Sequence, residues 1–299
     1  MSNSSADSAG VEPTLSIVVG SNGAAGSVER FLAALEPQAE RGSHVEVIVC
    51  EPEASPTAVR ERFAFARFHE RRGALVPELW RDGIDLTTGE LVALTISPME
   101  PASNWVETIR NRLGQVDAVG GAIEPGERLR LVDWAEYFCR YANDMLPFPP
   151  RESVDLSGDN AAYRRDGLVE AGHSWADGFW EPDVHRALKT AGRTLVHDPA
   201  LVVRQGRSAG FTAFVRQRLV HGRAYGRQRG VRFGAARNLA GILLAFVVPG
   251  VLLLRQAGAV LAKRRHRGAL VTSLPALLAF DVAWAVGEAL GHLDTLRRR

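Results

Sequence analysis

Residues 89–105, with the sequence GELVALTISPMEPASNW, have the pattern of a buried strand followed by a loop and a helix. Leu91 to Ile96 are apolar or β-branched, as expected for a strand covered on both faces, and two prolines then end it. Because open α/β sheets bind ligands beyond the carboxyl ends of their strands, the residues after Ile96 are expected to line a functional site. In that loop Ser97 and Glu100 offer the polar side chains, which is few for a catalytic loop.

Strand and helix patterns alternate on both sides of this stretch. Strands are expected at 14–20, 44–50, 66–69 and 116–123, and helices at 27–35, 57–65, 77–86 and 105–113. Such alternation predicts an α/β fold with a doubly wound, mostly parallel sheet. The glycine-bearing turn GSNGAAG at 20–26 matches neither the dinucleotide-binding fingerprint nor a P-loop, so the pattern does not support a Rossmann oxidoreductase.

Composition bounds the domain count and the partners. A chain of 299 residues with 46% hydrophobic and 23% charged residues can hold one large α/β domain or two small ones. A net charge of +2 predicts no nucleic-acid partner, although arginines crowd residues 216–237. Cys50 and Cys139 lack metal or redox spacing and are expected as buried thiols. Residues 1–13 are small and polar, without the layout of a signal peptide, and are expected to form a disordered tail.

The C-terminal third contains two apolar stretches, 239–254 and 269–290, separated by the basic sequence KRRHR at 263–267. A spanning helix needs about 20 mainly apolar residues, and Pro249 interrupts the first stretch. If both stretches spanned, basic residues would flank the membrane on both sides, against the positive-inside tendency. A kinked hairpin in one leaflet, or interfacial helices, would keep them on one face. The sequence therefore predicts that residues 231–299 form a membrane-associated helical hairpin; two buried helices in a soluble domain are the alternative.

The middle of the chain contains two candidate functional segments. The first, DLSGDNAAYRRDGLVEAG at 155–172, places a Gly-Asp-Asn turn before a short run and a helix. In the second, at 177–205, Glu181 and Asp183 begin a helix. Because acidic residues in a first helical turn are also ordinary dipole and capping partners, spacing alone does not assign them a catalytic role.

From residue 15 to residue 226 the order of motifs resembles the family 2 inverting glycosyltransferases, which have the GT-A fold. LSIVVGSN (15–22) stands at that family's opening strand, and VEVIVCEPEAS (45–55) where it has paired aspartates that contact base and ribose. VPELWRDGIDLTTGELVAL (76–94) resembles the lead-in to its metal motif, and WVETI (105–109) its tryptophan-led helix. SGDNAAYRRDGL (157–168) resembles its acceptor-side stretch, and FWEPDVHRALKTAG (179–192) falls at the Glu-Asp motif of the general base.

The resemblance implies a nucleotide-sugar-dependent transferase of the cell envelope, acting on a lipid-linked or polysaccharide acceptor. It implies a cell-membrane location, with a GT-A-like catalytic domain at 14–230 on the cytoplasmic side. By position, the candidate catalytic residues are Glu181 and Asp183. The candidate donor-binding residues are Ser21, Glu51, Arg81, Ser97 and Glu100, and the candidate acceptor-binding residues are Asp159, Asn160 and Trp180.

Two departures from the family pattern bear on the chemistry. Ile96, Ser97 and Pro98 stand where the family has Asp-x-Asp, which binds a divalent cation against the diphosphate. A hard cation needs several oxygen ligands, so no metal cofactor is expected, although Glu100 could replace one ligand for Mg²⁺ or Mn²⁺. Arginines are the candidate counter-charges, since a guanidinium binds phosphate bidentately; these are Arg81, Arg164, Arg165 and Arg204.

The second departure is at the base motif, where EPD (181–183) replaces Glu-Asp. Counting back from Gly192 puts Glu181 at the base position, with an ambiguity of a residue or two. Two functions of different class therefore remain: an inverting transferase, or a non-catalytic GT-A-like protein that binds a nucleotide, a glycan or a partner enzyme at the membrane. The intact SGDNAAYRR and a carboxylate at 181 favour the first, and the missing Asp-x-Asp favours the second.

Overall fold

The computed structural model describes residues 14–21, 24, 26–41, 44–127, 129–206 and 210–298. The expected tail at 1–13 lies outside the described residues, as do three positions of the glycine-bearing turn.

The described strands form one nine-stranded sheet of order β3-β2-β1-β4-β8-β6-β9-β5, with β7 paired to β9. Six strands run in one direction. Strands β2 and β4 are parallel to β1, and β3 is parallel to β2. Strand β8 is antiparallel to both β4 and β6, so β6 and its parallel partner β9 run in the same direction as β1. This confirms the predicted α/β class with a mostly parallel sheet. The strands are β1 (Leu15–Gly20), β2 (Val45–Glu51), β3 (Ala66–Glu70), β4 (Leu91–Ile96), β5 (Met99–Pro101), β6 (Ala118–Pro125), β7 (Arg151–Glu152), β8 (Asn160–Arg164) and β9 (Leu195–Gln205).

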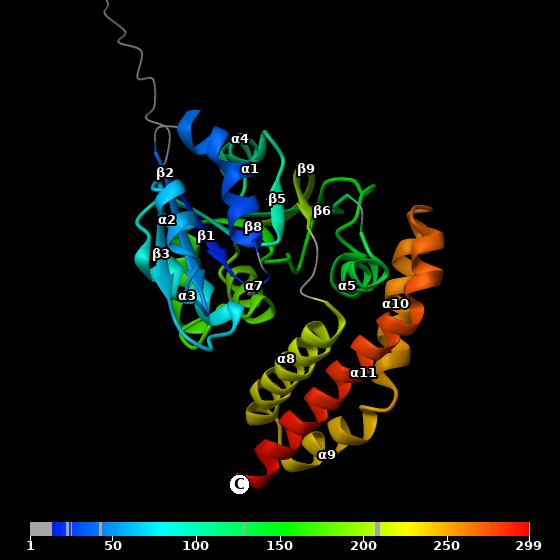
Figure 1. Ribbon diagram of the computed structural model, residues 1–299. Coiled ribbons are helices and arrows are strands. Elements are labelled where there is room, and N and C mark those ends of the chain that lie inside the picture. The colour runs from blue at the N-terminus through cyan, green and yellow to red at the C-terminus, as the bar shows by residue number, and fades with distance from the viewer. Residues whose placement is uncertain are drawn as a thin grey trace, which may run out of the picture.

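Helices connect the strands and then form a separate layer at the C-terminal end (Figure 1). They are α1 (Ser27–Arg41), α2 (Thr57–Arg62), α3 (Val76–Leu86), α4 (Trp105–Leu113), α5 (Leu131–Tyr141), α6 (Arg165–Glu170), α7 (Glu181–Thr190), α8 (Phe211–Arg232), α9 (Ala235–Leu244), α10 (Val248–Ala262) and α11 (Arg267–Arg297). The helix expected at 105–113 has those bounds, whereas α1 continues past Pro37. Gln38 supports its last turns by bonding Ala102 O at 3.0 Å and the backbone N–H of Val106 at 3.0 Å.

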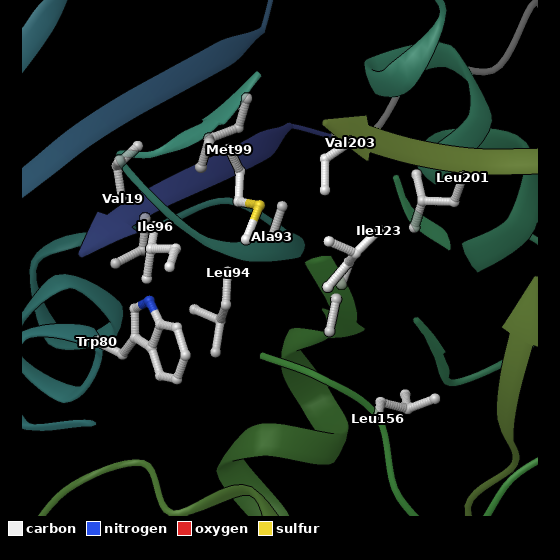
Figure 2. Packing of buried hydrophobic residues seen from close by; sticks show 14 of the residues in the cluster. Val19, Trp80, Ala93, Leu94, Ile96, Met99, Ile123, Leu156, Leu201 and Val203 are labelled. Atoms are coloured by element: carbon white, nitrogen blue, oxygen red, sulfur yellow. The ribbon is translucent and has the colours of Figure 1, made fainter. Parts of the chain in front are cut away.

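The core beneath the candidate site is apolar and fully buried. Figure 2 shows Trp80 of α3 beside Leu94 and Ile96 of β4, with Val19 and Met99 close by. The Trp80 indole N–H donates to Thr95 O at 2.8 Å, which fixes the ring under the end of β4. Of the two thiols expected to be buried, Cys50 is buried and Cys139 is half-buried.

The C-terminal layer, α8 to α11, is built on a close pairing of α8 with α11, which run alongside each other in Figure 1. A β-carbon at Gly226 would lie 2.2 Å from Glu288 O, and one at Gly291 would lie 2.3 Å from Arg223 O. Side chains at these positions would therefore separate the helices. Among the described residues α11 is long and apolar enough to cross a bilayer, and α9 with α10, bent by 63°, would count as a second, broken span.

This layer is attached to the α/β domain at two places, near the start of α11 and at the end of α8. Before α11, Lys263 donates to Asn143 O at 2.7 Å and Arg265 pairs with Glu124 at 2.7 Å. Towards the other end, Arg229 of α8 pairs with Glu288 of α11 at 2.8 Å. Arg232, at the end of α8, pairs in turn with Asp183 of α7 at 2.7 Å, which attaches the far end of the layer to the domain.

Candidate active site

A cavity of about 550 Å³ lies between the α/β domain and the C-terminal layer. The end of β4, α5, the loop before β8 and the start of α7 line its domain side, and α8 and α11 line the other. Its polar and aromatic lining includes Trp80, Arg140, Asp159, Trp180, Glu181, Asp183, Gln217, His221, Tyr225, Arg229, Arg232 and Trp284. The helical layer is thus one wall of the site.

A second cavity of about 190 Å³ lies at the ends of β1 and β2. Ser21 and Pro52 line it from the sheet, and Phe214 lines it from α8. It shares Gln217 and His221 with the larger cavity, so the two are neighbours. The second cavity lies at the strand ends, and the larger cavity beside it contains the carboxylates. Together the two cavities can accommodate a two-part ligand.

Glu181 is the first residue of α7 and lines the larger cavity. Removal from bulk water, and next the negative charge of Asp159, raise the pKa of Glu181 to about 7. The backbone N–H of Gly158 lies 3.4 Å from its Oε1, so the Gly-Asp-Asn turn and the α7 motif meet here. Trp180, half-buried just before α7, lines the same cavity. A carboxylate with this pKa can both accept and release a proton at neutral pH.

Asp183, the other predicted catalytic acid, is engaged by α8. Arg232 donates to it twice, at 2.7 and 2.8 Å, and Gln228 donates at 2.6 Å. Arg186 of its own helix adds a contact at 3.1 Å. Asp183 therefore clamps α7 to the helical layer, and these contacts use its oxygens.

The two acceptor-side candidates in the Gly-Asp-Asn turn differ in environment. Asp159 lines the cavity and accepts from Arg140 Nη2 at 2.6 Å and from the Tyr141 hydroxyl. Asn160 is 0% exposed: its Oδ1 accepts from Trp105 Nε1 at 2.8 Å, and its amide donates to two backbone carbonyls. Asn160 joins β8 to α4, β6 and β9, outside the cavity lining.

Two of the predicted donor-side residues lie near the second cavity. Ser21 lines it, whereas the carboxylate of Glu51 is 0% exposed. The Ser55 hydroxyl donates to Glu51 at 2.6 Å and Arg60 also pairs with it. Glu51 therefore organises the start of α2.

The other three donor-side candidates bind neighbours within the protein. Ser97 is buried with its Oγ 2.8 Å from Ser27 Oγ, Glu100 on β5 lies 3.7 Å from Arg30 Nε, and Arg81 pairs with its neighbour Asp82. None of these three lines either cavity. The other candidate cations also lie outside the linings of both cavities. Arg165 donates to Thr87 Oγ1 at 2.8 Å, Arg164 donates to Leu113 O at 3.3 Å, and Arg204 is exposed on β9.

The residues at the end of β4 do not fit a divalent cation. Ile96 lines the cavity without a side-chain oxygen, and Ser97 faces Ser27. Among the described residues no group of three or more His, Cys, Asp or Glu side chains is arranged to hold a metal ion.

Sequence reasoning missed the contributions of α5, α8 and α11 to the cavity. Arg140 has no distinguishing local pattern. For α8 a signal was present: Gly222, Gly226 and Gly230 recur every four residues, which puts them on one helix face. Such a face permits close helix packing, and it meets α11.

No protein-family model and no curated protein matches the chain. Among solved structures it is similar to the mannosyltransferase PcManGT from Pyrobaculum calidifontis, in complex with GDP-Man and Mn²⁺. The identity is 16%, the likeness covers 93% of this chain and 87% of that chain, and the TM-score is 0.53. It is also similar to GalNAc-T7 with UDP, GalNAc and Mn²⁺, at 13% identity over 73% of this chain and 51% of that chain, with a TM-score of 0.48. The first likeness shows a GT-A-like fold alone.

Proposed function

We propose that this protein is a membrane-associated, family 2 glycosyltransferase that moves a sugar, with inversion, from a nucleotide donor to a lipid-linked or polysaccharide acceptor. The observation that carries the proposal is Glu181, a carboxylate with a pKa of about 7 that lines the cavity with Asp159 and Trp180. General bases are most effective when their pKa lies near the working pH. The GT-A-like fold supports the same reading by analogy.

In the proposed reaction Glu181 accepts the proton of the acceptor hydroxyl while that oxygen attacks the anomeric carbon. A carbon–oxygen bond forms, the bond between the anomeric carbon and the diphosphate breaks, and its electron pair leaves with the nucleoside diphosphate. Attack from the face opposite the leaving group inverts the configuration. The ring of Trp180 offers an apolar face to a sugar. The cavity beside Ser21 is the proposed nucleotide site.

The experiment that tests the proposal is a donor screen with the full chain. UDP- and GDP-sugars are supplied with membrane lipid extract, and release of nucleoside diphosphate is measured. The alternative is a non-catalytic protein that binds a nucleotide, a glycan or a partner enzyme, and it is favoured by Ile96 and Pro98, which stand where the family has aspartates. Nucleotide binding without diphosphate release from any donor would support that alternative.

We expect nucleotide binding to be independent of metal. Ile96 and Pro98 have no side-chain oxygen, so any cation would rest on distant acids and on the ligand itself. Calorimetric titration of UDP and GDP should therefore give the same affinity in EDTA and in Mn²⁺. A hundredfold loss in EDTA, about 2.7 kcal/mol, would show that other residues rebuild a metal site.

The contacts of α11 favour a position along the membrane surface. A helix of 31 residues is about 46 Å long, and a spanning helix must place its ends on opposite sides of about 30 Å of hydrocarbon. The loop before α11 bonds the α/β domain through Arg265, and Glu288 near its other end is joined to the domain through α8. Both parts of α11 are therefore connected to the same α/β domain, which supports interfacial helices over spanning ones.

The outer face of the layer has the composition of a lipid-binding surface. Phe246 is 89% exposed and Leu254 is 76% exposed. Other exposed apolar residues on these helices are Leu239, Leu243, Leu244, Val247, Val251, Leu261, Val271, Leu278, Val282 and Val286. Residues 199–280 contain no Asp or Glu, so their arginines favour the anionic lipid of a cytoplasmic leaflet.

Substituting Phe246→Asp and Leu254→Asp together should lower binding to anionic lipid vesicles at least tenfold, since inserting each side chain contributes about 1.5–3 kcal/mol. The matched control is Val154→Asp with Val169→Asp, two apolar residues 80% and 70% exposed on the α/β domain, which should bind like wild type. Vesicle sedimentation measures both, and alkaline carbonate should release the wild-type chain. Retention in carbonate would contradict the interfacial position.

A further inference from the structure

The larger cavity is lined both by a half-buried cation and by Ile96, which stands at one of the positions where the family pattern has its metal motif. A departing nucleoside diphosphate is negatively charged, and a site shielded from water must offer it positive charge. Ile96 provides none, yet Arg140 of α5 lines the same cavity, together with Asp159 and Glu181.

Arg140 has spare hydrogen-bonding capacity in this position. A guanidinium carries five N–H donors, and the hydrogen bond found among the described residues is the 2.6 Å one from Nη2 to Asp159. The guanidinium also lies 5.1 Å from the centre of the Tyr141 ring, whose hydroxyl donates to the same carboxylate. Asp159 and Tyr141 thus hold the guanidinium in place while most of its donors remain for a ligand.

The other cations of the cavity are less suited to the same role. The side chain of Arg140 is 22% exposed, against 65% for Arg186, 42% for Arg229 and 49% for Arg232. Arg229 and Arg232 form ion pairs with Glu288 and Asp183 that join helices, and Arg186 pairs with Asp183 within α7. His221 is neutral at pH 7, because burial, and next Arg140, lower its pKa to about 4. A shielded charge also interacts more strongly than an exposed one.

We propose that Arg140 binds the donor diphosphate in place of a divalent cation, with Asp159 and Tyr141 as positioning residues. This inference rests on the proposed function and names the residue on which metal-free donor binding depends. The bidentate fork of a guanidinium matches two phosphate oxygens.

The experiment is calorimetric titration of the full chain in EDTA with UDP, GDP and their nucleosides uridine and guanosine. Arg140→Met removes the charge and keeps most of the volume, so the affinity for the diphosphate should fall roughly tenfold to a hundredfold, while nucleoside affinity stays unchanged. The matched control is Arg112→Met, which removes an arginine from another buried carboxylate, Asp198, away from both cavities. It should leave both affinities unchanged.

A double variant separates phosphate binding from mere compensation of the Asp159 charge. Arg140→Met with Asp159→Asn removes both members of the ion pair, so Asp159 is not left as an uncompensated charge. If Arg140 binds the diphosphate, this variant binds UDP and GDP as weakly as the single variant. Wild-type affinity in the double variant, or in Arg140→Met itself, overturns the inference and leaves the transferase function standing. Absence of diphosphate binding to wild type would remove both.

Discussion

Glu181→Gln should lower turnover by roughly two to four orders of magnitude while donor binding persists. The amide keeps the shape of the side chain but cannot accept the acceptor's proton, and its Oε1 can still accept from the Gly158 N–H. Turnover is measured as product formed with the active donor, and donor affinity by calorimetry. The effect should therefore appear in kcat and leave donor affinity within a few-fold of wild type.

The matched control for this change is Asp183→Asn, in the same first turn of α7. Because Asp183 is held by Arg232 and Gln228, its amide should weaken the clamp between α7 and α8 and cause the smaller loss of turnover. A severe loss in Asp183→Asn with a mild one in Glu181→Gln would assign the base to Asp183.

The pH profile gives a second measurement of the same base. A general base acts in its deprotonated form, so the rate should rise as the pH increases through the pKa of Glu181, about 7. Below that pH the Glu181 carboxylate is already protonated and cannot accept the proton of the acceptor hydroxyl. Glu181→Gln should abolish this limb of the profile, whereas Asp183→Asn should retain it.

Asn160→Ala should lower the free energy of unfolding by about 3–9 kcal/mol, because three polar groups lose a hydrogen-bond partner and each such loss costs about 1–3 kcal/mol. The position is 0% exposed, and the change removes the partners of Trp105 Nε1, Ala122 O and Leu201 O. For a chain whose total stability is of the order of 5–15 kcal/mol, this is a large fraction. Thermal and denaturant unfolding measure it.

Asn104→Ala is the matched control, because Asn104 is exposed and its side chain forms no capping hydrogen bond at the start of α4. Its stability should stay close to that of wild type. Asn160 was also expected, from the family resemblance, to bind the acceptor. Unchanged stability in Asn160→Ala together with a raised KM for the acceptor would favour that role over the structural one.

Much of the α/β fold could be predicted from sequence because its signals are local. The apolar run at Leu91–Ile96 ends at a proline-bearing loop, and β4 has those bounds. The helix beginning at Trp105 likewise has its expected limits. Where a longer-range contact intervened, the prediction stopped short: α1 extends past Pro37 because Gln38 bonds the segment around Ala102 and Val106.

The candidate site was only partly accessible to sequence reasoning. Asp159 and Glu181, singled out by motif, do line one cavity. Ser97, Glu51 and Asn160 occupy motif positions as well, but each is enclosed by partners that a linear pattern does not reveal. A motif assigns a position along the chain, whereas the direction and the hydrogen bonds of the side chain depend on neighbours distant in sequence.

The sequence by itself determined the alternation of strands and helices, the missing acids after β4 and the apolar C-terminal stretches, since each follows from the order of residue types. Tertiary structure alone decided that the C-terminal layer completes the cavity. That arrangement depends on α8 and α11 approaching closely at Gly226 and Gly291 and on the ion pair between Arg232 and Asp183. The fold also places Arg140 of α5 in the lining of the same cavity as Ile96. Such contacts join segments far apart in the chain, and their free energy arises only when the whole fold has formed.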